Sequence, residues 1–158
     1  MTYDAQLMKK IGIDIFSGAG GLSLGGAMAG IKVRYAIEVN PHAAKSFELN
    51  HKGAKVICGD IRDVKATDFL NKDEEVFIIM GGPPCQGFSM SNTMSRNMDN
   101  PNNLLFKEFV RLVSEIKPRW FVLENVWGMT KMNNGETIEM IKHCFEEIEP
   151  GYKVKWKV

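Results

Sequence analysis

Short apolar runs alternate with amphipathic stretches along the chain, and this alternation predicts strands separated by helices. Five runs predict strands: Ile11–Phe16, Val33–Ile37, Lys55–Ile57, Val76–Met80 and Trp120–Leu123. The tail, Tyr152–Val158, alternates apolar residues with lysines at a period of two. This tail is therefore predicted to be a half-buried strand whose lysines lie on its open face.

Apolar residues spaced three and four positions apart predict the helices, as in Leu105–Ile116 and Ile138–Ile148. A helix of small residues should run from the turn at Gly18–Gly21 to near Gly30. The stretch Pro41–Asn50 should form another helix, because proline suits the first helical position.

The order of these elements predicts an α/β fold with a mostly parallel, Rossmann-like sheet and helices on both faces. No repeat, low-complexity tract or linker divides the chain, so residues 1–158 are expected to form one domain. Ligands of such sheets lie beyond the carboxyl ends of the strands. The chemically distinctive residues of this chain all follow predicted strands and should therefore lie at that edge.

Composition narrows the class of protein without identifying a function. The 20 basic and 19 acidic residues nearly balance, which argues against a free-standing nucleic-acid binder. The three cysteines lie far apart and no histidine pair has metal-ligand spacing, so neither a disulfide framework nor a metal site is expected. The start lacks signal-peptide features, and no apolar run reaches the roughly 18 residues of a membrane helix. We therefore expect a cytoplasmic protein that makes no membrane contact.

A glycine-rich segment, Gly18–Gly21, follows the first predicted strand. Glycines let the backbone turn sharply beside a ligand, although a tight turn without a ligand has the same pattern. Glu38 ends the second strand, where a carboxylate can accept hydrogen bonds from ribose hydroxyls, and Asp60 follows the third. Because position 23 is Ser23 and no Gly-Lys-Ser/Thr follows, the nicotinamide and phosphate-loop fingerprints are absent. The pattern favours a nucleoside cofactor without a polyphosphate, and S-adenosylmethionine fits.

Cys85 stands on a stiff loop at the end of the fourth predicted strand. The residues before it, Gly81–Pro84, are two glycines and two prolines, which stop the strand. Nothing in the pattern calls for a core residue there, so the thiol is interpreted as a nucleophile. Cys58 and Cys144 are instead interpreted as small buried residues.

Glu124 follows the fifth predicted strand and is the candidate partner of Cys85. Because it comes directly after the apolar run Phe121–Leu123, it is expected to be half-buried. Burial would favour the protonated carboxyl, which can donate a proton. A thiol and a neighbouring acid are the minimum for covalent attack on an electron-poor ring.

Taken in order, the segments Phe16–Gly21, Glu38, Asp60, Pro83–Gln86 and Glu124–Val126 resemble the DNA cytosine carbon-5 methyltransferase family. The resemblance covers residues 11–158, and its most specific element is Pro-Cys-Gln followed by Glu-Asn-Val. It implies an S-adenosylmethionine-binding catalytic domain used in restriction–modification or epigenetic DNA methylation.

The resemblance also implies roles for individual residues. S-adenosylmethionine would be bound by Phe16, Ser17, Gly18, Ala19, Gly20, Gly21, Leu22, Glu38, Val39, Asp60, Ile61, Gly82, Pro83 and Leu105, with Leu104 as an alternative to Leu105. Catalysis would depend on Cys85, Glu124, Pro84 and Asn125, and DNA contacts on Gln86, Ser89 and Ser91.

The implied reaction is covalent. Glu38 would take the ribose hydroxyls, and Asp60 with Ile61 would contact the adenine. Cytosine would leave the duplex stack, because its ring carbons cannot be reached there. Cys85 would attack ring carbon 6 while Glu124 protonates or hydrogen-bonds ring nitrogen 3, and carbon 5 would take the methyl group. Asn125 and Pro84 would hold and shape the Cys85 loop.

Three other functions fit the residues less well. An amino-group methyltransferase has Asp/Asn/Ser-Pro-Pro-Tyr/Phe where this chain has Gly-Pro-Pro-Cys. A zinc deaminase needs a second cysteine at the position of Phe88. A non-enzymatic S-adenosylmethionine-binding module would not require Cys85 or Glu124. In the polar loop 88–100, closure over DNA and a plain connector remain alternatives; for Arg111, phosphate contact is less favoured than an ordinary solvated face.

The family pattern continues past position 158 with Gln-Arg-Arg-Glu-Arg and a target-recognition region. The chain is accordingly interpreted as an expressed fragment, a split-enzyme subunit or a truncated product. Double-stranded DNA would be its partner, as would a second polypeptide if the enzyme is split, with nucleoid association if the source is bacterial. We predict that residues 1–158 alone bind cofactor weakly and show little or no methyl transfer. Transfer of labelled methyl groups to duplex DNA tests this, and robust methylation would refute it.

Overall fold

The computed structural model describes residues 10–84, 104–127, 135–149 and 151–157. Its centre is a five-stranded sheet in the order β3-β2-β1-β4-β5, and all four strand pairs are parallel. The strands are β1 (Ile11–Ile15), β2 (Lys32–Glu38), β3 (Lys55–Cys58), β4 (Val76–Gly81) and β5 (Trp120–Leu123). The predicted parallel α/β fold is confirmed.

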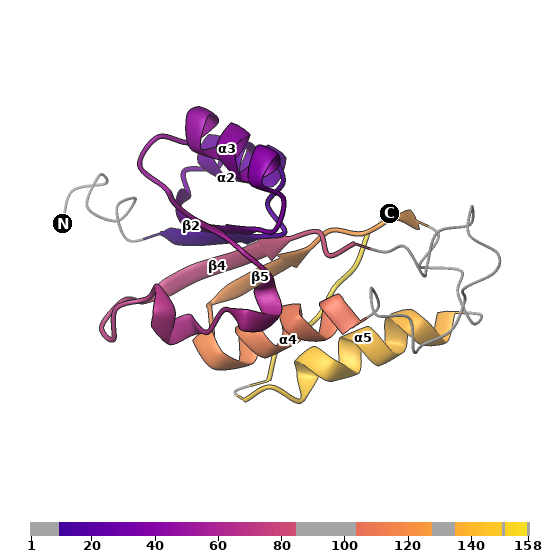
Figure 1. Ribbon diagram of the computed structural model, residues 1–158. Coiled ribbons are helices and arrows are strands. Elements are labelled where there is room, and N and C mark those ends of the chain that lie inside the picture. Colours follow the sequence, from indigo (N-terminus) through magenta and orange to yellow (C-terminus); the bar gives the residue numbers. More distant parts are fainter. Residues whose placement is uncertain (1–9, 85–103, 128–134, 150, 158) are drawn as a thin grey trace.

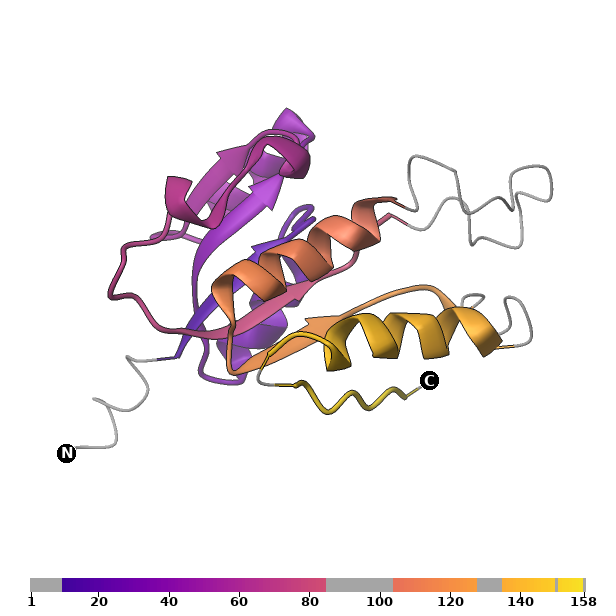
Figure 2. The ribbon, with the colours of Figure 1, turned by 90° about the horizontal axis from the view of Figure 1, so that it is seen from below.

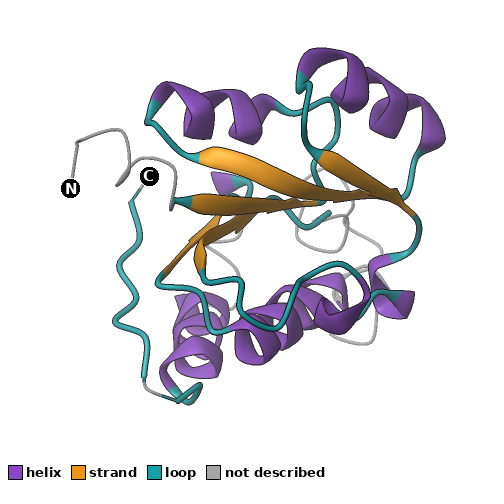
Figure 3. Cartoon of the chain, turned by 90° about the vertical axis from the view of Figure 1, so that its left-hand side faces the viewer, coloured by secondary structure: helices purple, strands orange, loops and turns teal. Residues whose placement is uncertain are grey.

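Helices cover both faces of this sheet, as Figures 1 and 3 show. Helices α2 (Gly21–Met28) and α3 (Pro41–Asn50) lie on one face. Helices α4 (Leu104–Ile116) and α5 (Glu136–Glu146) lie side by side on the other (Figure 2). Two 3₁₀ turns between β3 and β4, η1 (Ile61–Asp63) and η2 (Ala66–Asp68), were not predicted.

The larger part of the core lies between the sheet and helices α4 and α5. Ile13 and Ile15 of β1 are fully buried against a cluster that includes Phe109 and Phe145. The rings of Phe121 and Phe145 stack with their centroids 4.1 Å apart. Burial of such side chains contributes most of the stabilisation of a domain this size. This face therefore anchors β1, β4 and β5, whose ends carry the candidate site.

The tail departs from its prediction. The predicted alternation is present from Tyr152 to Lys155, since Tyr152 and Val154 are half-buried and the two lysines are exposed, but Trp156, expected on the buried face, is exposed. Residues 152–157 nevertheless form no strand and pair with none of the five described strands, although Tyr152 packs on Phe121 of β5 with the ring centroids 5.3 Å apart. The Tyr152 hydroxyl donates to the Pro118 carbonyl oxygen at 2.6 Å. A groove of about 860 Å³ separates this tail from β5.

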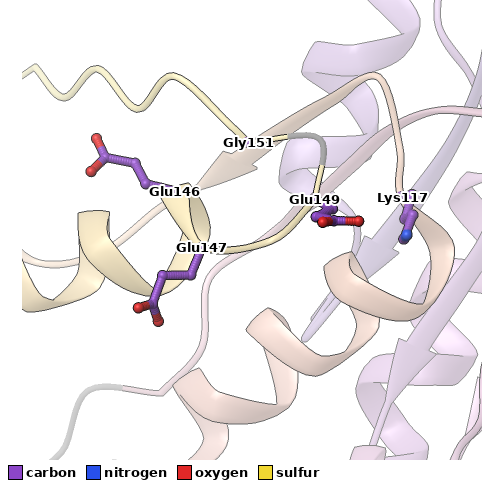
Figure 4. A pocket seen from close by; sticks show the side chains of 5 residues that line it. All are labelled: Lys117, Glu146, Glu147, Glu149 and Gly151. Carbon is purple, nitrogen blue, oxygen red and sulfur yellow. The ribbon is translucent and has the colours of Figure 1, made fainter.

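A second hollow, of about 610 Å³, lies at the opposite end of β5 from the candidate site. It is lined by Lys117, Glu146, Glu147, Glu149 and Gly151. In Figure 4, Glu149 lies on the side of Lys117, whereas Glu146 and Glu147 point away from it. No described helix is long and apolar enough to span a membrane.

Gly81 of β4 pairs with Ile15 of β1 and leaves no room there for a side chain, so its substitution should destabilise the fold. A Cβ at this position would lie 2.1 Å from the Ile15 carbonyl oxygen, which is backbone and cannot turn away. We expect Gly81→Ala to lower the free energy of unfolding by about 2 kcal/mol or more, measured by urea denaturation. Gly25→Ala is the control, because nothing lies within 4 Å of its Cβ and alanine favours the helix. Equal stability of the two variants would contradict the packing described.

Candidate functional site

The candidate residues lie along one edge of the sheet. Because all five strands are parallel, their carboxyl ends meet at that edge. The strand order brings together, from one side to the other, Asp60, Glu38, the Phe16–Gly21 turn, Gly82 and Glu124. The chain order reverses between β1 and β4, which is the switch point where open α/β sheets bind ligands. The glycine turn and Gly82 flank this switch point.

The turn after β1 has an unusual backbone. Gly18 and Gly20 have φ angles of 54° and 98°, in the region that favours glycine. Phe16 also has a positive φ, 59°, although its bulky side chain disfavours that conformation by about 1–3 kcal/mol. The Ser17 amide donates to the Ile37 carbonyl oxygen at 3.2 Å, and the Gly20 amide to Ser17 at 2.9 Å. Strain of this kind is typical of ligand-binding turns.

Glu38 holds this turn from the neighbouring strand. One of its carboxylate oxygens accepts the Gly18 amide at 2.8 Å, and the other accepts the Asn40 amide at 2.8 Å. Each oxygen retains a lone pair, and the side chain is half-buried. Glu38 therefore has capacity left for two hydroxyl donors, so the residues present fit a ribose. The assignment of Glu38 to the cofactor remains a prediction.

Asp14 and Ser23 form a buried pair beneath the turn that sequence reasoning missed. Asp14 is fully buried, and its Oδ2 accepts the Ser23 amide at 3.1 Å and the Ser23 hydroxyl at 2.5 Å. Its other oxygen has no partner among the described residues. Burial raises the pKa of Asp14 to about 6, the two Ser23 hydrogen bonds oppose this shift, and the charge of Glu38 adds to it. The sequence did contain one signal of this pair: Asp14 is a carboxylate within the apolar run Ile11–Phe16.

The end of α3 packs on the same turn. A Cβ at Gly20 would lie 2.1 Å from Nε2 of His51, whose ring packs on Phe47 with the centroids 4.4 Å apart. Asn50 donates to the Ala19 carbonyl oxygen at 3.4 Å. His51 had no assigned role, because nothing in its spacing along the chain indicates this contact. Glycine is required at position 20 both by its φ angle and by the histidine ring.

The expected adenine-binding segment begins at the end of β3. Asp60 caps η1 by accepting the Arg62 amide at 3.0 Å, and its carboxylate also pairs with the Arg62 guanidinium. These hydrogen bonds lower the pKa of Asp60 to about 2. Ile61 is buried in the core. Cys58 is exposed, so its interpretation as a buried residue is wrong.

The other cofactor residues expected from the sequence lie near the same edge. Val39 is 65% exposed, and Leu22 is half-buried in the first turn of α2. Leu105, in the first turn of α4, is half-buried against the core. The three residues come from different elements, and none of these placements tests a ligand contact.

Glu124 lies directly beside the loop that leaves β4. Its amide donates to the Gly81 carbonyl oxygen at 2.9 Å, and its Oε2 would be 2.7 Å from a Cβ on Gly82. The side chain is exposed rather than half-buried, so that expectation is wrong. Position 124 lies just past the end of a short edge strand, where no neighbouring strand among those described covers it.

The rest of the expected catalytic set is only partly described. Pro83 is buried and Pro84 is exposed. The Asn125 side-chain oxygen accepts the Val126 amide at 2.7 Å. Four predicted residues lie outside the described residues: Cys85, Gln86, Ser89 and Ser91. Within the described ranges, no three histidine, cysteine or acidic side chains are grouped as metal ligands.

The fold and the site define a class of α/β protein: a doubly wound parallel sheet with a glycine turn and carboxylates at its switch point. Residues 11–158 match the family described as C-5 cytosine-specific DNA methylase. The chain therefore belongs to the C-5 cytosine-specific DNA methylase family.

Curated relatives agree with this membership. The chain is 42% identical over 149 residues to the type II methyltransferase M1.HphI of Haemophilus parahaemolyticus, covering 92% of this chain and 40% of that protein. It is 39% identical over 142 residues to M.FnuDI of Fusobacterium nucleatum, covering 90% and 39%. The chain thus spans about two fifths of the length of these relatives.

Solved structures support the same fold. A crystal structure described as a prophage-encoded DNA modification methyltransferase of E. coli is 36% identical, with a TM-score of 0.72. It covers 85% of this chain and 37% of its own length. The Dnmt2 methyltransferase of S. pombe, 22% identical with a TM-score of 0.63 over 87% of this chain and 41% of its own, shows the fold alone.

The buried Asp14 should make stability depend on pH in one direction. In the folded protein it holds its proton to about pH 6, but in the unfolded chain it ionises near its ordinary value of 3.8. The folded state therefore binds the proton more tightly, and stability falls as the pH rises between these values. Relative to Asp14→Asn, which cannot ionise, the wild type should lose about 3 kcal/mol across this window. Urea denaturation of both proteins at several pH values measures this difference, and parallel curves would contradict it.

Proposed function

We propose that the protein containing this chain transfers a methyl group from S-adenosylmethionine to carbon 5 of cytosine in duplex DNA. Membership of the C-5 cytosine-specific family and the type II methyltransferases among its relatives support this proposal. The observation that carries it is the position of Glu124. Its carboxylate lies against Gly82, three residues before Cys85, so the candidate acid stands beside the segment that carries the candidate nucleophile.

The cofactor end of the site fits a nucleoside that carries a sulfonium rather than phosphates. Glu38 has free lone pairs for ribose hydroxyls, and the Phe16–Gly21 turn leaves backbone close to the ligand position. When bound, S-adenosylmethionine supplies an electrophilic methyl group. The glycine turn and Gly82 would orient it, because they flank the same switch point.

The proposed reaction begins with the Cys85 thiolate bonding to ring carbon 6 of a cytosine that has left the stack. Glu124 donates a proton or hydrogen bond to ring nitrogen 3, so the electrons displaced from the ring are stabilised. Its exposure lets it reach a base entering from outside. Carbon 5 would then take the methyl group as the bond between that methyl and the sulfonium sulfur breaks, leaving a neutral thioether. It would lose its proton to a base, and a proton given to ring nitrogen 3 would return to Glu124. The carbon 6–sulfur bond then breaks, which restores the ring and the thiolate.

Use in restriction–modification is the setting that the bacterial relatives favour. DNA contacts by Gln86, Ser89 and Ser91, and support of the Cys85 loop by Asn125, belong to the same proposal. The near balance of charge over this chain is compatible with DNA contacts made mostly elsewhere in the protein.

Substitution of Cys85 and Glu124 in the complete protein tests this mechanism. Cys85→Ser should abolish the covalent adduct with 5-fluorocytosine DNA, seen as a denaturant-resistant complex. Glu124→Gln should lower kcat about 10²- to 10⁴-fold, because a positioned proton donor contributes that much, and should leave the Kd for cofactor unchanged.

Cys144→Ser provides the matched control, because Cys144 is half-buried in α5 away from the sheet edge. It should retain the adduct and the methyl transfer. Methyl transfer by Cys85→Ser at the wild-type rate would refute the covalent mechanism.

A further inference from the structure

Arg111 of α4 connects this helix to the segment that follows β3. Its Nη2 donates to the carbonyl oxygen of Ile61 at 2.9 Å and to that of Val64 at 3.0 Å. These two carbonyls bracket the turn η1, which begins directly after Asp60. These backbone contacts were not part of either interpretation considered from the sequence, a phosphate contact or an ordinary solvated face.

Two carboxylates hold the guanidinium in this position. Nε of Arg111 donates to Glu108 at 2.7 Å and Nη1 donates to Glu115 at 2.7 Å. The other oxygen of Glu115 accepts the Ala66 amide, at the start of η2, at 3.2 Å. Helix α4 therefore binds both 3₁₀ turns through side chains one helical turn apart. A planar guanidinium can make this set of bonds, whereas a lysine ammonium cannot.

This contact joins two walls of the proposed cofactor pocket. Asp60 and Ile61, expected at the adenine, lie at the start of η1, and Leu105 lies in the first turn of α4. The strand β3 is at the sheet edge and ends two residues before Asp60, so backbone pairing does not fix η1. Two kinds of contact with α4 hold η1 instead: Ile61 and Val64 are buried in the core cluster that includes Phe109 and Leu112, and Arg111 binds their carbonyl oxygens.

We propose that Arg111 is a positioning residue for the adenine of the cofactor, holding the Asp60–Ile61 turn in register with α4. This inference rests on the proposed function, since it assumes a nucleoside at this end of the site. Arg111 itself touches backbone and carboxylates, and it acts on the ligand through Asp60.

Binding of S-adenosylhomocysteine by the complete protein that contains this chain, measured by titration to millimolar ligand, tests this role. Arg111→Lys keeps the charge but loses the paired carbonyl bonds, so affinity should fall about tenfold, the loss expected when about 1.4 kcal/mol of positioning is removed. The thermal midpoint should shift by only a few degrees. Glu115→Gln, which weakens the same grip, should shift affinity in the same direction by less.

A double-mutant cycle separates positioning from general stability. If Arg111 acts through Asp60, Arg111→Lys combined with Asp60→Asn should bind no more than about threefold more weakly than the weaker single variant. Lys142→Ala, which removes the α5 pair with Glu139, should leave affinity within about twofold.

Unchanged affinity in Arg111→Lys, or additive losses in the cycle, would overturn the positioning role while leaving the proposed function intact. No binding by the wild-type complete protein at millimolar ligand would overturn cofactor binding itself and this inference with it.

Discussion

The candidate site depends on two carboxylates that hold one turn. Glu38 binds the Gly18 amide from β2, and Asp14 binds Ser23 from beneath, so the turn after β1 is fastened to its own strand and to the next. Both acids sit within the reach of each other's charge, which adds to the rise in the pKa of Asp14. The Asp14 bond satisfies the Ser23 amide, a donor in the first turn of α2 that would otherwise lack a partner.

The two faces of the sheet are packed differently around this turn. On the side of α2, glycines at positions 12 and 26 bring the helix close, and a Cβ at Gly26 would lie 2.9 Å from the end of Met80. On the other side, aromatic rings of α4, β5 and α5 fill a thicker layer. The packing of α2 supports the turn after β1, where the proposed cofactor would bind. The aromatic rings support the strand ends that carry Gly82 and Glu124.

Sequence patterns predicted the elements that follow from side-chain periodicity. Pro41–Asn50 and Trp120–Leu123 agree residue for residue, because a proline start and a bounded apolar run define them locally. The prediction of a strand in the tail was wrong, because an alternation of period two indicates which side chains face the core but not which strand pairs with the segment. Arg111 and His51 were missed for a related reason: their contacts, with η1 and with Gly20, lie about fifty and thirty residues away along the chain.

The positive φ of Phe16 also bears on how the turn keeps its shape. A phenylalanine at a φ of 59° persists only because its surroundings hold it there, and its ring packs against the core while its backbone turns toward the edge. The shape of the loop is therefore set by the hydrophobic interior and does not depend on a bound ligand. A ligand meeting such a loop loses little free energy to ordering it, so more of the contact energy remains as affinity.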